Sequence, residues 1–202
     1  AFNFPDYGSR YTDMRQTTFG TFEEIAPALF VLKKSVIDGG ADKVHLYGFS
    51  AGGGAIVNIL SVLNTDRYDQ VLNTWGIGAA EKKKIVQSIQ QGSVILEVPL
   101  KSFDEIADLF GSGDMRILAN RAKGNGLTPI ENIRELQGLS LNLFVYFANP
   151  DEGLGNRDDA EFIQRFKLAN AKGFTTAIVG KQGGHLAYHP ELCEAYLKFI
   201  YG

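Results

Sequence analysis

The stretch HLYGFSAGGGA, residues 45–55, constrains the fold of this chain more than any other part of its sequence. It sets one serine, Ser50, among glycines, directly after a short run of apolar residues. Beyond it, apolar side chains recur at helical spacing at Ile56, Ile59, Leu60 and Leu63. The pattern predicts a short buried strand that turns sharply into a helix with an inward apolar stripe. Gly48 to Gly52 also match G-x-S-x-G in this strand–turn–helix context, so we predict that Ser50 is a nucleophile.

The reason for this pattern is steric and electrostatic. The turn forces the serine into a strained backbone conformation, and we expect side chains at Gly48 and Gly52 to clash there. The helix that begins at Ala51 directs its free N–H groups and its positive dipole end at the same point. We therefore expect the N–H of Ala51 to stabilise an oxyanion formed next to Ser50.

An anion-binding loop is the structural alternative for the same glycines. A P-loop requires a lysine followed by Ser or Thr after its last glycine, but Ala55 and Ile56 follow Gly54 here. No glycine spacing in the chain opens a helix with the G-x-G-x-x-G pattern of dinucleotide-binding proteins. The absence of both patterns favours the interpretation of Ser50 as a nucleophile over an anion-binding loop.

Strands and helices alternate along the rest of the chain. We expect strands at 43–49, 93–100, 141–148 and 174–180, and helices at 21–38, 51–63, 80–91, 158–171 and 190–201. This alternation predicts an α/β fold with a mostly parallel sheet and helices on both faces. The chain has no internal repeat or linker, so we expect a single domain over 1–202, with a small helical cap inserted at about 101–138.

The general base has to come from three histidines. His185 follows the loop VGKQGG directly after a predicted strand, and the two glycines let that loop approach Ser50. His45 lies on the strand that leads to Ser50, where a packed or edge histidine is expected. His189 precedes Pro190 and therefore prefers an extended backbone, so His185 and His189 do not form a helical metal pair. We predict His185 as the base and no metal site.

The supporting carboxylate is expected in the loop ANPDEGLGNRDD. Asp151 lies just past the carboxyl end of a predicted strand, where an acid can reach an imidazole and fix its tautomer. Asp158 and Asp159 lie at a predicted helix start, where aspartate is an ordinary capping residue, and Glu152 would point the other way in an extended loop. We predict Asp151 as the acid, with Asp158 as the alternative.

These motifs resemble the α/β-hydrolase superfamily. The similarity rests on HLYGFSAGGGA, ANPDEGLGNRDD, GKQGGHLAYH and the opening FNFPDYGSRY, and it covers nearly the whole chain. Membership implies an eight-stranded sheet, no cofactor, and hydrolysis of an ester, thioester or amide through an acyl-serine intermediate. The order Ser50, Asp151, His185 is the order of that family's triad.

The resemblance also has two gaps. If residues 1–4 are the family's fourth strand, its first three strands and the loop with the second oxyanion N–H have no counterpart. We therefore expect a longer native chain, a partner chain that completes the sheet, or a degenerate site. The predicted helix at 80–91 is also not a standard element of that family.

Composition narrows the classes of partner. The formal net charge of −3 gives no indication of nucleic acid or an anionic membrane. Cys193 is the only cysteine, which excludes an internal disulfide and favours a reducing, cytoplasmic location, although a targeting segment could precede Ala1. No apolar run is long enough to span a membrane.

Two functional hypotheses follow. The first is a serine hydrolase that acts on a small acyl substrate, and the apolar face that we expect on the cap favours acyl esters over charged substrates. A peptidase of the same fold would differ only in its substrate. The second is a non-catalytic hydrolase-like module that serves as a binding or scaffold protein.

Overall fold

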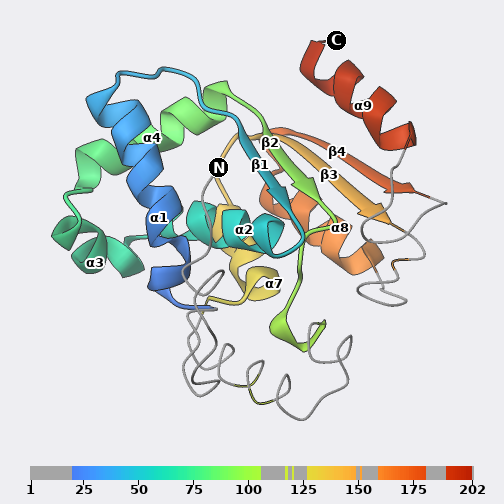
Figure 1. The fold of residues 1–202 in the computed structure, drawn as a ribbon, viewed down its shortest axis with the longest axis horizontal. Coiled ribbons are helices and arrows are strands. Elements are labelled where there is room, and N and C mark those ends of the chain that lie inside the picture. Colours follow the sequence, from blue (N-terminus) through green and yellow to red (C-terminus); the bar gives the residue numbers. More distant parts are fainter. Residues whose placement is uncertain are drawn as a thin grey trace, which may run out of the picture.

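A computed structural model describes residues 20–105, 117, 120, 127–148, 151, 159–180 and 190–201. Its sheet has four strands in chain order: β1 (Leu46–Phe49), β2 (Val94–Glu97), β3 (Asn142–Ala148) and β4 (Phe174–Gly180). Every neighbouring pair of these strands is parallel. The fold class predicted from the sequence is confirmed, and all carboxyl strand ends lie at one edge of the sheet (Figure 1).

One face of the sheet carries the larger core. Helix α2 (Ala51–Asn64) lies against it, and every residue from Gly53 to Leu63 is buried. A helix that is buried all round must be covered on its outer side as well. The helices that share its core are α1 (Phe22–Lys33), α4 (Ala79–Gln91) and α8 (Asp159–Ala169). The helix that begins at Ser50 is therefore the central packing element of the described fold.

The opposite face is covered by α9 (Pro190–Tyr201) (Figure 1). Phe144 of β3 lies at the centre of this smaller core. Its ring centroid is 6.1 Å from that of Tyr196 and 5.2 Å from that of Phe199. Helices therefore cover both faces, as the alternation of strands and helices predicts.

Helix α1 confirms the spacing argument for residues 21–38. Its apolar positions Ile25, Leu29 and Leu32 are buried, and a π-helical turn, η1 (Lys34–Asp38), continues it to Gly39. The carboxylate of Glu24 accepts the N–H of Gly20 at 2.6 Å. Gly20 directly precedes Thr21, the N-cap residue of α1.

Three short elements were missed by the sequence analysis. These are η2 (Asp66–Tyr68), α3 (Asp69–Thr74) and η3 (Ile133–Leu136), too short to show a helical period. The ammonium of Lys82 links the residues on either side of η2. It lies 2.6 Å from the carbonyl oxygen of Thr65 and 2.6 Å from Asp69 Oδ1. A run of three lysines at 82–84 is typical of a solvated helix face, but the side chain of Lys82 is only 11% exposed.

Residues 127–136 pack directly on α2. The segment contains α7 (Pro129–Asn132), which begins with proline at its first position, where no backbone N–H is needed. Asn58 of α2 donates to the carbonyl oxygen of Leu127 at 2.8 Å and accepts from Asn132 at 2.9 Å. Half of the expected cap at about 101–138, including residues 106–116, lies outside the described residues. The cap and the single domain over 1–202 remain predictions.

The search for membrane spans gave a negative result. Within the described ranges, no helix combines the length and the apolarity needed to cross a bilayer.

Asn170 provides a test of the packing between β3 and β4. Its side chain is 2% exposed, accepts the N–H of Leu141 at 2.9 Å and donates to the Thr175 hydroxyl at 2.9 Å. Asn170→Ala leaves the Leu141 N–H without this acceptor, so we expect the free energy of unfolding in urea to fall by about 2–3 kcal/mol. The exposed Lys172→Ala in the same turn should change it by less than about 0.5 kcal/mol. Equal effects of the two substitutions would contradict this role of Asn170.

Candidate active site at the Ser50 turn

Ser50 lies at the carboxyl end of β1, directly before α2, and its backbone is strained. Its φ is 52° and its ψ is −119°. Among the described residues other than glycine, only Ser50 and Val98 have a positive φ. Such a conformation costs about 1–3 kcal/mol and persists only where the surrounding structure enforces it.

The enforcement comes from backbone hydrogen bonds. The Ser50 N–H donates to the carbonyl oxygen of Glu97 at 2.9 Å. The Ser50 carbonyl oxygen accepts from Gly53 at 3.0 Å, Gly54 at 3.2 Å and Leu100 at 3.0 Å. Both backbone polar groups of the serine are thus held by β2, by the segment after it and by the first turn of α2.

The segment after β2 departs from a regular ladder at this point. Phe49 is in register with Glu97, so Ser50 lies opposite Val98. In a regular parallel ladder the Ser50 carbonyl would accept the N–H of residue 99. Residue 99 is a proline and has no N–H, and the donor is Leu100 instead. The extra residue is accommodated at buried Val98, which has a φ of 41° although it is β-branched.

The glycines are needed at three positions. A Cβ on Gly48 would lie 2.5 Å from the carbonyl oxygen of Gly52, which is backbone and cannot rotate away. A Cβ on Gly53 would lie 2.8 Å from Pro99, and one on Gly54 would lie 3.0 Å from the carbonyl oxygen of Leu100. At Gly52, however, no described atom lies within 4 Å of such a Cβ, so these contacts do not support the clash expected there.

The structure describes only some of the other residues predicted for the site. Ala51 is the first residue of α2, next to the strained serine. Asp151 lies three residues past the end of β3 and is only 2% exposed. His185, His189, Glu152 and Asp158 lie outside the described residues, so the structure gives no distance between Ser50 and the predicted base. His45 is exposed, directly before β1.

A buried charge cluster that the sequence analysis missed lies along this edge. The ammonium of Lys101 is 3.6 Å from Glu105 Oε1 and 3.7 Å from Oδ1 of Asp159, the first residue of α8. The Lys101 N–H also donates to Glu105 Oε2 at 2.7 Å. All three side chains are at most 13% exposed. Asp159 is therefore held by a cation.

A second carboxylate near Ser50 is also occupied. Glu97 ends β2, and its Oε2 accepts the hydroxyl of Tyr47 at 2.6 Å. Burial and this hydrogen bond raise the pKa of Tyr47 well above its usual range, and burial also raises the pKa of Tyr196 next to it. This group belongs to the face covered by α9, and its hydrogen bond directs the Glu97 carboxylate toward Tyr47.

A cavity of about 740 Å³ runs along the outer edge of β1. It reaches Gly48, Phe49 and Gly52 of the Ser50 turn. Its walls include Ala28, Val31 and Leu32 of α1 and Ala55, Ile56 and Ile59 of α2. Within the described residues β1 pairs only with β2, so this edge is open there. The described residues contain no group of three His, Cys, Asp or Glu side chains that could hold a metal ion.

Solved structures share this fold at low sequence identity. Esterase B from Lactobacillus rhamnosis superposes with a TM-score of 0.58 at 15% identity, over 92% of this chain and 59% of that one. An alpha-beta hydrolase from Vibrio vulnificus gives a TM-score of 0.51 at 17% identity, over 89% and 57%. The acylaminoacyl peptidase of Pyrococcus horikoshii gives a TM-score of 0.53 at 12% identity, over 88% of this chain and 25% of that one.

The fold is that of the α/β-hydrolases. No model of a known family and no curated protein sequence matches the chain significantly, so the relationship rests on structure. The chain spans about a quarter to three fifths of the lengths of these α/β-hydrolases. None of the comparisons supports a partner chain that completes the sheet.

The two glycines that flank Ser50 allow a matched test. Gly48→Ala places a methyl group against the Gly52 carbonyl, and we expect it to lower the free energy of unfolding by about 2–3 kcal/mol. Gly52→Ala points into open space within a helix, and we expect no loss or a gain of up to about 1 kcal/mol. Urea denaturation of both variants measures the difference. A Gly48→Ala variant as stable as Gly52→Ala would show that the turn is not sterically locked.

Proposed function

We propose that this chain is a serine hydrolase that cleaves an ester, thioester or amide through an acyl-serine intermediate. The observation that carries the proposal is the strained Ser50, with φ of 52° between β1 and the first turn of a buried helix. The strand itself is only partly buried, since Tyr47 is 55% exposed, so the buried strand expected at 43–49 is not observed. Strain of this kind is retained where function needs it, because a relaxed turn would turn the hydroxyl away from the sheet edge.

The chemistry follows from the residues at this edge. His185 takes the proton of the Ser50 hydroxyl as the oxygen attacks the acyl carbonyl carbon, and Asp151 stabilises the resulting imidazolium. The N–H of Ala51 donates to the oxyanion, aided by the dipole of α2. The imidazolium then gives its proton to the leaving group, and water releases the acid with His185 again as base.

An ester is the substrate class that we favour. Similar folds include esterase B, for which a complex with a tributyrin phosphonate is described, and an acylaminoacyl peptidase. The cavity beside the Ser50 turn has many apolar side chains, including Val31, Leu32, Ile56 and Ile59. Such walls suit an acyl chain better than a charged group.

An alkyl fluorophosphonate probe tests the nucleophile. The native chain should be labelled on one serine, and Ser50→Ala should abolish the labelling. Ser61→Ala is the matched control, because it removes a fully buried hydroxyl from the same helix and should leave the labelling rate unchanged. A native chain that resists the probe would favour the alternative, a hydrolase-like binding module.

The choice of acid can be tested separately. Asp151→Asn should lower kcat for a short-chain ester by about 10⁴-fold, because the imidazole would lose its tautomer and its counter-charge. Asp159→Asn removes a partner of Lys101 and should reduce stability while leaving kcat within about threefold. His185→Ala should abolish turnover. If Asp159→Asn lowers kcat as strongly as Asp151→Asn does, the assignment of the acid is wrong.

A further inference from the structure

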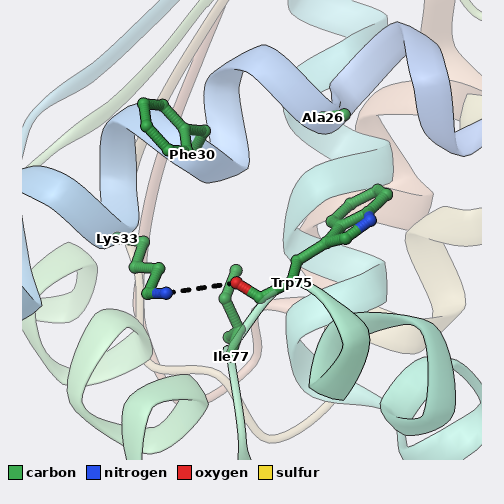
Figure 2. Close-up of a pocket in the computed structure, with 5 residues that line it drawn as sticks. All are labelled: Ala26, Phe30, Lys33, Trp75 and Ile77. Carbon is green, nitrogen blue, oxygen red and sulfur yellow. Dashed lines mark hydrogen bonds between the residues drawn. The ribbon is translucent and has the colours of Figure 1, made fainter.

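A second cavity, of about 300 Å³, lies on the outer side of α1. Ala26, Phe30 and Lys33 of α1 form one side of it, and Trp75 and Ile77 form the other (Figure 2). None of these residues borders the Ser50 turn. The volume is at the lower limit of small-molecule sites, which are mostly apolar with a few fixed polar groups.

The apolar walls are partly fixed before any ligand arrives. The Trp75 ring packs edge-on against Phe22 at a centroid distance of 5.9 Å, and Phe22 packs in the same way on Tyr68 at 4.9 Å. Ile77 is 2% exposed and forms a rigid part of the lining. Phe30, in contrast, is 60% exposed, so a large aromatic surface faces solvent next to the cavity.

The polar group that lines this cavity is the ammonium of Lys33, which a backbone carbonyl holds in place. Lys33 Nζ donates to the carbonyl oxygen of Trp75 at 3.1 Å (Figure 2). It also lies against the turn at Gly76, where φ is 68° and a Cβ would be 2.6 Å from Nζ. An ammonium has three protons, so two remain for a ligand, and the side chain has already lost much of its conformational freedom.

Within the part of the chain that the structure describes, this charge is not neutralised by a contact ion pair. Among the described residues, no carboxylate lies within ion-pair distance of Lys33 Nζ. The nearby Asp38 is bound by Lys34 at 2.7 Å, although the charge of Lys33 also contributes to the lowered pKa of Asp38. A held cation beside two aromatic rings is complementary to an anion with a flat apolar body.

We propose that this cavity is a binding site for small aryl or arylalkyl carboxylates. The carboxylate accepts hydrogen bonds from Lys33, and the ring packs between Phe30 and Trp75. The site is separate from the Ser50 turn and does not depend on the proposed hydrolysis.

The test uses Trp75 itself, which is the only tryptophan of the chain, so its fluorescence reports on this cavity alone. The full chain is titrated with phenylacetate and with phenylacetamide, its neutral isostere, and the same titrations in Ser50→Ala exclude interference from turnover. Phenylacetate should change the Trp75 emission saturably and bind at least about tenfold more tightly than the amide, as expected for a charge-assisted hydrogen bond.

Substitutions separate a binding role of Lys33 from a structural one. Lys33→Gln should weaken the binding of phenylacetate about tenfold and leave the binding of phenylacetamide nearly unchanged. If Lys33 only stabilised the wall of the cavity, the substitution would weaken the binding of both ligands. Lys198→Gln removes the same charge from an exposed position on α9, on the opposite face of the sheet, and should leave both affinities unchanged. Phe30→Ala, at an exposed position, should weaken both ligands.

Three results would overturn the proposal. These are equal affinity for acid and amide, equal losses for both ligands in Lys33→Gln, or no saturable response of Trp75 to either ligand.

Discussion

The backbone of Ser50 is the constraint on which the rest of this structure depends. Its positive φ is held by one hydrogen bond from its N–H and three to its carbonyl, which together offset about 1–3 kcal/mol of strain. Those bonds require the chain after β2 to cross the first turn of α2 at contact distance. Gly53 and Gly54 make that crossing possible, and Gly48 leaves room for the Gly52 carbonyl. The glycines therefore follow from backbone packing around the serine.

The same crossing also links Ser50 to the start of α8. Leu100 donates its N–H to the Ser50 carbonyl, and the next residue, Lys101, reaches Asp159 at the start of α8. Two consecutive residues thus connect the β1–α2 turn with the helix that follows β3. Removing one partner from a buried ion pair costs several kcal/mol, so this connection resists independent movement of its two ends. The residues expected to form the cap continue from the same point, so their start is fixed relative to the serine.

The sequence predicted the strands, the long helices and the position of Ser50 because each has a local cause. Apolar runs such as LNLFVYFA form strands buried on both faces, and the spacing of Ile25, Leu29 and Leu32 indicates a helix at any position in a fold. The strain at Val98 depends instead on the partner strand, since it arises only when Pro99 lies opposite the Ser50 carbonyl. The ion pairs of Lys82 and Lys101 likewise join residues whose proximity the tertiary fold creates. Asp151 could be placed at a strand end by pattern alone, but its contact with His185 remains a prediction.

The geometry of the turn is independent of the open edge of β1. In a parallel strand, alternate residues direct their N–H and C=O groups to opposite sides. The N–H groups of Leu46 and Ser50 bond to Ser93 and Glu97, so Tyr47 and Phe49 direct theirs away from β2, toward the cavity. The backbone hydrogen bonds of Ser50 to Glu97, Gly53, Gly54 and Leu100 thus come from β2, the segment after it and α2 itself. A chain segment or an acyl group along the open edge would change the walls beside the serine without altering the bonds that hold its backbone.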